Sequence, residues 1–221
     1  MKKKYLKCAS IILISILFLA LGICLFCKSY SNSERDVIQY TEKGNVNYNV
    51  YLNENNFFDQ PFLGPGQAYI TTLINYLDIN FKYDFDTLDN RSGSYTYYIK
   101  AEISANTTSG GENSFWKKSY NLTEPKTIDY SNTNKISILE NIKVDYQYYN
   151  DIMLNFKKEY GLALNGNLKI ILYVENNIKS DIVEHDISKA ASLYFNIPLT
   201  KATIEVPADV SNIENNDTIF S

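Results

Sequence analysis

The chain has 221 residues, 45% of them hydrophobic, and a formal net charge of −4 at pH 7. Four lysines precede its first hydrophobic run and all acidic residues follow it, so residues 28–221 carry 17 − 25 = −8. Because that surplus repels nucleic-acid phosphates and anionic lipid headgroups, the composition excludes both as general partners. About 190 residues after the run are enough for one domain with its own core.

The first predicted element is a membrane span from Cys8 to Cys27, which contains no charged residue. As a helix with a rise of about 1.5 Å per residue it measures about 30 Å, the thickness of a bilayer's hydrocarbon core. The basic head, residues 1–7, predicts a cytoplasmic N-terminus, because positive flanks stay inside. We therefore expect a single-pass cell-membrane protein whose domain from residue 28 onward is extracytoplasmic.

Two alternatives to an uncleaved anchor stay open. The run is longer than the hydrophobic region of a signal peptide, and its candidate cleavage sites place a bulky residue where a small one is needed. The segment Leu21-Gly22-Ile23-Cys24 resembles a lipoprotein lipidation motif, with Ile23 where such motifs carry a small residue. Cleavage and lipidation are therefore less favoured than an anchor.

A short tether, residues 28–34, leads into a predicted domain, residues 35–206. Apolar alternation over residues 37–41 and 46–52, on either side of Gly44, predicts two paired strands. Residues 53–67 are irregular and contain the turn Gly64-Pro65-Gly66.

The strongest alternation covers residues 77–86 and 95–105, with a turn signal at residues 90–93 between them. It predicts a hairpin that residues 115–122 extend to a three-stranded antiparallel meander. Residues 128–144 hold only weak strand signals.

A change of period predicts one amphipathic helix, with apolar residues three and four apart from Tyr149 to Tyr160 and a stop at Gly161. Apolar residues again alternate with polar ones in residues 168–174, 193–199 and 203–206, which predicts three more strands. Pro198 predicts an edge strand or a strand end, because it has no N–H to donate. Residues 207–221 are acidic and rich in Asn, and we expect them to be disordered.

Together these elements predict a mostly β domain, an antiparallel β-sandwich of immunoglobulin-like architecture with one amphipathic helix, behind an N-terminal transmembrane helix. All three cysteines, Cys8, Cys24 and Cys27, lie in the predicted span, so the outer domain has no disulfide to stabilise it.

The sequence offers little for catalysis. The outer domain has one histidine, His185, and no cysteine, which excludes a zinc site built on those residues within one chain. No nucleophile elbow and no glycine-rich phosphate loop is present. We assign no catalytic residue, no cofactor and no firm metal site.

Asp84, Asp86 and Asp89 form the metal candidate, a set of hard oxygen ligands that suits calcium. The competing interpretation is a charged face that keeps the sheet soluble. Glycoside hydrolysis needs only two carboxyl groups at a set separation, so it stays open.

Tyr51, Tyr76 and Tyr98 occupy strand positions that otherwise face water, in a chain with 19 tyrosines. Exposed aromatic rings can present a platform to a cell-surface glycan or protein. The alternative is structural, since tyrosine is an ordinary strand residue whose hydroxyl reaches water.

Four stretches carry a family resemblance: Tyr48-x-Val50-x-Leu52-x-x-Asn55, Phe81-x-Tyr83-x-Phe85, Tyr95-x-Tyr97-x-Ile99-x-Ala101, and Trp116-Lys117-Lys118 leading to Leu122. Over about residues 35–206 the chain resembles domain-of-unknown-function family 5305, prokaryotic membrane-anchored extracytoplasmic proteins. The resemblance implies no activity and no catalytic residues. Members of that family often have a second hydrophobic span near the C-terminus, which residues 207–221 do not contain.

The expected function is a non-catalytic binding or structural module at the cell surface, held by the membrane and in contact with a protein or a glycan. Two alternatives are an envelope enzyme, carbohydrate-active or calcium-dependent, and an accessory subunit of a secretion or surface-assembly complex. Nucleic acid is not an expected partner.

Overall fold

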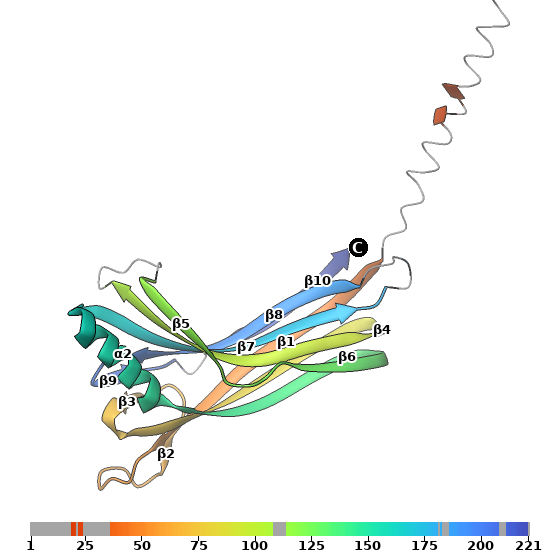
Figure 1. Ribbon diagram of the computed structural model, residues 1–221. Helices are drawn as coiled ribbons and strands as arrows, with labels where there is room; N and C mark the ends of the chain where they lie inside the picture. The colour runs from red at the N-terminus through yellow and green to blue at the C-terminus, as the bar shows by residue number, and fades with distance from the viewer. Residues whose placement is uncertain are drawn as a thin grey trace, which may run out of the picture.

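A computed structural model describes residues 19–20, 22–23, 36–107, 114–180, 182, 186–207 and 211–220. The described body is mostly β, with curled antiparallel sheets and one helix (Figure 1). Its large sheet has eight strands, in the order β10-β1-β4-β7-β8, with β2 beside β1 and with β5 and β6 beside β4. The second sheet pairs β3 with β9. The strands are β1 (Val37–Leu52), β2 (Phe62–Leu63), β3 (Ala68–Ile70), β4 (Ile74–Thr107), β5 (Trp116–Asn121), β6 (Lys126–Asp145), β7 (Leu164–Ile178), β8 (Ile187–Leu199), β9 (Thr203–Glu205) and β10 (Asn212–Phe220).

β4 organises the sheet, and it is one strand of 34 residues where a hairpin was predicted. Its first half pairs with β1, up to Tyr40 opposite Thr87, and its second half pairs with β7 from Gly93 onward. β6 follows β4 along the other side, with register shifts between Asp86 and Gly93. The hairpin prediction is therefore wrong, because residues 87–92 form a bulge in a continuing strand and do not reverse the chain.

Gly93 allows neighbouring strands to approach β4 closely at the bulge, because glycine has no side chain. A Cβ atom at that position would lie 2.2 Å from the Asn177 carbonyl oxygen and 2.8 Å from the Tyr130 hydroxyl. Gly44, predicted to lie in a turn, is likewise inside a continuous β1, where its added Cβ would lie 2.6 Å from Leu193 of β8. Both glycines mark places where two strands come unusually close.

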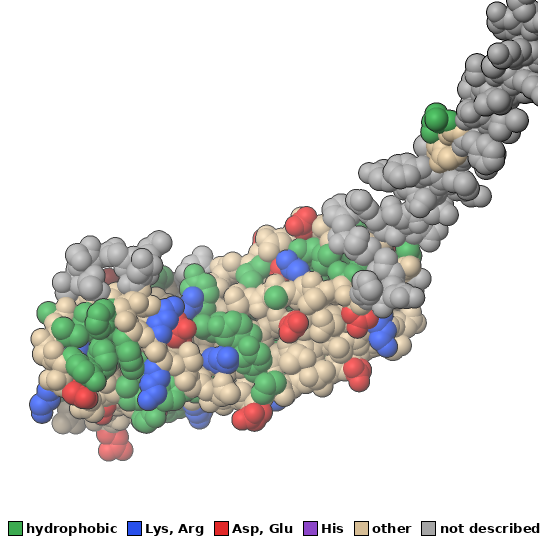
Figure 2. All heavy atoms as spheres, turned by 45° about the horizontal axis from the view of Figure 1, so that its top comes forward, with side chains coloured by type: hydrophobic (Ala, Val, Ile, Leu, Met, Phe, Trp, Pro, Cys, Tyr) green, Lys and Arg blue, Asp and Glu red, His purple; other side chains and the backbone are tan. Residues whose placement is uncertain are grey.

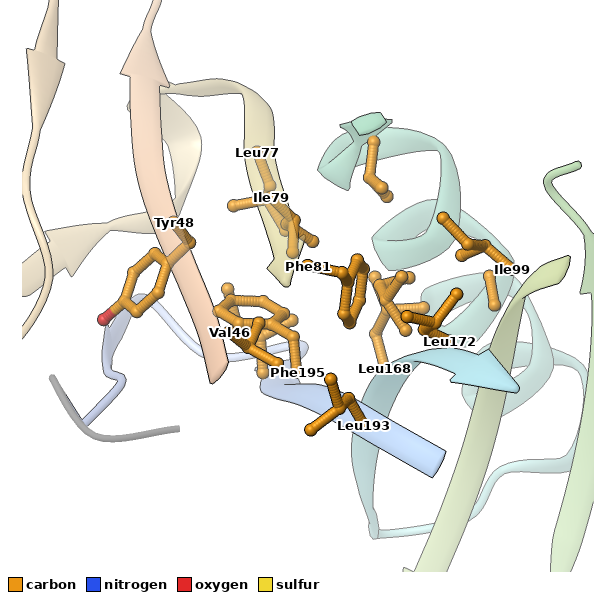
Figure 3. Close-up of a cluster of buried hydrophobic side chains, with 14 of the residues drawn as sticks. Val46, Tyr48, Leu77, Ile79, Phe81, Ile99, Leu168, Leu172, Leu193 and Phe195 are labelled. Atoms are coloured by element: carbon orange, nitrogen blue, oxygen red, sulfur yellow. The ribbon is translucent and has the colours of Figure 1, made fainter. Parts of the chain in front are cut away.

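The core lies between the two halves of the curled sheet. Figure 3 shows buried side chains from β1, both halves of β4, β7 and β8 pointing toward one another. Tyr48 of β1 packs on Phe195 of β8 with ring centroids 4.8 Å apart. Since β1 and β8 are not hydrogen-bonded neighbours in the sheet, this contact shows that the halves face each other. Apolar burial on this inner face is the main stabilising term for the fold.

The predicted amphipathic helix is confirmed as α2, Tyr146–Tyr160. The Asp145 side chain caps its start by accepting a hydrogen bond from the Tyr148 backbone N–H, and Gly161 ends it with a left-handed φ of 62°. Tyr146, Tyr149 and Met153 are buried against the sheet. The helix packs on β4, β7 and β8, at the end of the body away from the entry of the chain at Asp36 (Figure 1).

The C-terminal segment departs from its prediction. Asn212–Phe220 forms β10, which pairs antiparallel with β1 from Val37 to Asn45, where a disordered tail was expected. Its inward positions include Asn215, whose amide donates to the buried Glu42 carboxylate. No strand was predicted here, because polar residues occupy positions where alternation would require apolar ones.

Other strand predictions are confirmed. β5 and β9 lie within residues 115–122 and 203–206, whereas β7 and β8 contain residues 168–174 and 193–199 and are longer than predicted. Pro198 lies one residue from the end of β8, the last strand in the order. Residues 53–67 are irregular apart from β2.

The predicted span, Cys8 to Cys27, lies outside the described residues except at 19–20 and 22–23, which are helical. Across the described residues, no helix has both the length and the apolar character that a bilayer crossing requires. The tether, residues 28–34, and His185 also lie outside the described part.

Candidate functional site

The three aspartates do not form a metal site. Asp84 accepts a hydrogen bond from Ser137 and lies 3.5 Å from Lys82, while Lys135 lies 3.9 Å from Asp84 and 3.7 Å from Asp86. Burial alone would raise the pKa of Asp84, but Ser137 and the two lysines lower it below its usual value. In the described ranges, no group of three or more His, Cys, Asp or Glu side chains is close enough to hold a metal ion. The arrangement is that of a charged outer face.

The predicted platform separates into two clusters. Tyr51 of β1 and Tyr76 of β4 are stacked with centroids 4.5 Å apart, Phe62 packs on Tyr51, and Lys143 lies over the Tyr76 ring. Tyr98 lies in the other half of β4 and stacks on Tyr173 of β7 at 5.2 Å. All four tyrosines are half-buried. The structure therefore brings together Tyr51 and Tyr76 and gives Tyr98 a different partner.

The cluster at Tyr98 includes residues that the sequence analysis missed. The Lys100 ammonium lies 5.0 Å from the Tyr98 centroid and 5.7 Å from that of Tyr173. Lys169 of β7 lies 4.0 Å from the ring centroid of Tyr194 on β8. The sequence could have indicated the two tyrosines of this cluster. Tyr173 and Tyr194 alternate with the apolar residues of two predicted strands, which places them on the outer face of the sheet.

A further aromatic group covers the seam between α2 and β5. Trp116 stacks on Phe156 at 4.5 Å, and Tyr148 meets Tyr120 edge to face at 6.2 Å. Phe115 and Tyr160 are 63% and 59% exposed, which is high for rings of this size. In Figure 2, hydrophobic side chains gather at the end of the body that carries α2.

The buried ionisable groups are engaged with one another. Arg91 at the bulge lies 3.2 Å from Asp36, which also accepts from Ser180 at 2.7 Å. Glu42 accepts from the Tyr83 hydroxyl at 2.9 Å and lies 3.9 Å from Lys189 of β8. Burial, followed by the charge of Glu42, raises the pKa of Tyr83, so its phenol stays protonated. These contacts join separate strands, which is a structural role.

One open cleft of about 500 Å³ lies beside the bulge, on the strands β1, β4 and β10. Its lining residues include Asp86, which stands opposite Thr41 of β1, and Asp217, which stands opposite Tyr40. Because Tyr40 and Thr41 are consecutive, the two aspartates lie on opposite faces of the sheet. Thr41 donates a hydrogen bond to Asn216 across the β1–β10 pair. A cleft of this volume lies within the range of small-molecule pockets.

Comparison with known proteins gives no assignment: no family model matches the chain, and no curated protein matches it. The resemblance to family 5305 therefore depends on the four sequence stretches alone. These begin in β1, in the two halves of β4, and in β5.

Proposed function

We propose that this chain is a membrane-anchored extracytoplasmic module that binds a cell-surface component without catalysis. The anchor is the span from Cys8 to Cys27, and the body is sandwich-like, with its two facing sheet halves in the role of the two layers. The family 5305 resemblance implies the same membrane-anchored, extracytoplasmic address.

The observation that carries the proposal is the placement of tyrosine pairs on outward faces of the sheet. Tyr98 alternates with Ile99 and Ala101, which are 1% and 0% exposed, so core packing does not account for its ring. Tyr98 and Tyr173 are instead held flat against each other, as are Tyr51 and Tyr76. Rigid, half-exposed aromatic rings lose little conformational entropy on binding, which makes them efficient contact residues.

The charged groups support binding over catalysis. The buried carboxylates of Asp36 and Glu42 pair with cations of other strands, and Asp84 is held by Ser137 and two lysines. Carboxylates engaged in this way stabilise the fold and are poorly placed to exchange protons with a substrate.

Retention of the full chain on isolated cell wall tests the proposal. We expect the full chain, extracted in mild detergent, to be retained, and retention to fall by about tenfold in Tyr98→Ala/Tyr173→Ala, a loss typical of a contact hot spot. Tyr160→Ala removes an equally large exposed ring at the end of α2 and serves as the matched control. Equal retention of all three proteins contradicts the proposal. Companion proteins that co-purify without wall retention favour an accessory subunit.

A further inference from the structure

The outer face around Ile171 is built as a small grid of three strands. β4, β7 and β8 place Lys100 beside Ile171 and Tyr194 in one row. Tyr98, Tyr173 and Ser192 form the next row, and Glu102, Lys169 and Asn196 form the row on the other side. Ile171, at the centre, is only 6% exposed although it belongs to the outer face, so its neighbours cover it.

The two lysines of this grid form no close ion pair, although Glu102 stands directly opposite Lys169 in the sheet. Within the described residues, neither Lys100 nor Lys169 lies within 4.0 Å of a carboxylate, and both ammonium groups contact tyrosine rings. The nearby Glu102 carboxylate is instead paired with Lys117 at 3.3 Å. Two such cations stand on one face of a domain with a surplus of eight negative charges.

The tyrosines complete a surface suited to sugars. Tyr194 is 40% exposed, and Tyr98 and Tyr173 are held nearly parallel at 22°. Burial, followed by Glu102 and Tyr98, raises the pKa of Tyr173, so its hydroxyl stays neutral and able to donate a hydrogen bond. Lys100 and Lys169 stand at diagonal positions of paired strands, about 7–8 Å apart at the sheet.

We propose that Lys100, Lys169, Tyr98, Tyr173 and Tyr194 bind a linear anionic polysaccharide. The ammonium groups contact its carboxylates and the ring edges contact its apolar C–H surfaces. The inference depends on the proposed binding function and names the class of ligand. Figure 2 shows basic and acidic side chains interspersed over the visible face.

Binding of the full chain in detergent to polygalacturonate tests the inference, with neutral dextran as the comparison polymer. We expect polygalacturonate to bind and dextran not to bind, with affinity falling as salt is added. Lys100→Gln/Lys169→Gln should raise the Kd about tenfold or more and weaken the salt dependence. Lys100→Arg/Lys169→Arg should keep most of the affinity, because the charges remain.

The matched control is Lys43→Gln, which removes one exposed lysine that pairs with Glu214 on another part of the sheet. Polygalacturonate binding that is equal in wild type and Lys100→Gln/Lys169→Gln overturns the inference. Binding to anionic phospholipid vesicles in place of polygalacturonate also overturns it. If cell-wall retention still depends on Tyr98 and Tyr173 in either case, the binding function stands and only the ligand class is wrong.

Discussion

Buried charges stand at the points where separate strands meet. Asp36, where the chain enters the body, is 3% exposed and pairs with Arg91 in the bulge of β4. Glu42 of β1 and Lys189 of β8 form a second such pair across the two halves of the sheet. A buried ion pair contributes little net stability over an apolar pair, but losing one partner leaves an unpaired charge.

Arg91→Met should therefore lower the free energy of unfolding by about 3–5 kcal/mol, because it removes a cation that lies 3.2 Å from the buried Asp36 carboxylate. Lys43→Met, which removes the exposed pair with Glu214, should lower it by at most about 1 kcal/mol. Urea unfolding followed by the fluorescence of Trp116, which packs on Phe156, measures both. Equal losses in the two variants would show that Asp36 does not need this partner.

Gly93→Ala should destabilise the body by about 1–3 kcal/mol or more, because the new methyl group would overlap the Asn177 carbonyl oxygen and force the strands apart. Gly64→Ala is the matched control, since nothing lies within 4 Å of its added Cβ, and it should change stability by less than about 1 kcal/mol. Thermal unfolding of both variants compares them. A neutral Gly93→Ala would contradict the close approach at the bulge.

At the scale of elements, periodicity alone predicted the identity of α2 and of most strands but not how far each strand continues. Gly44 and Gly93 were read as turn residues because glycine more often ends a strand than continues it. In the structure each glycine permits a contact between distant strands, Leu193 with β1 and Asn177 with β4. Such contacts depend on the tertiary arrangement, which a single sequence does not contain.

The capping of α2 gives a local test. Asp145→Ala removes the acceptor for the Tyr148 N–H and should lower the free energy of unfolding by about 1 kcal/mol. Asp151→Ala changes an exposed carboxylate within the same helix and should be close to neutral. Circular dichroism during urea unfolding measures the difference. A loss that is as large for Asp151 as for Asp145 would contradict the cap.

For the molecule as a whole, the buried and half-buried tyrosines predict that the folded state loses stability at alkaline pH. Burial first, with smaller effects of neighbouring groups, raises the pKa of Tyr130 and that of Tyr149 to about 12, above their ordinary value. Between pH 10 and 12 the unfolded chain loses these phenol protons while the folded chain keeps them. The unfolded state then binds fewer protons, so stability falls as the pH rises through this window.

We expect the urea midpoint of the wild type to fall between pH 9 and 11, and to fall less in Tyr130→Phe/Tyr149→Phe. The comparison is between the two slopes, because removing the Tyr130 hydroxyl also removes its hydrogen bond to Asn176. Identical slopes would show that these phenols ionise in the folded state as readily as in the unfolded one.

For the candidate site too, the sequence pattern predicted which face a side chain lies on but not which residues are its neighbours. Alternation placed Tyr51, Tyr76 and Tyr98 on outer faces, and the structure finds all three half-buried on strands. It did not show that Tyr98 has Tyr173 as its neighbour, because β4 and β7 are far apart in sequence. The three aspartates were grouped as a metal candidate because they are close in sequence. In the structure, lysines from β4 and β6 form ion pairs with Asp84 and Asp86.

The membrane-anchored, extracytoplasmic body is the central claim, and cysteine labelling tests it most directly. All three native cysteines lie in the predicted span, so Ser119→Cys, at an exposed position of β5, places a thiol in the body. A membrane-impermeant maleimide added to intact spheroplasts should label Ser119→Cys in the membrane fraction and leave the wild type unlabelled. Labelling that requires permeabilised cells, or a body recovered free in the medium, would contradict the account.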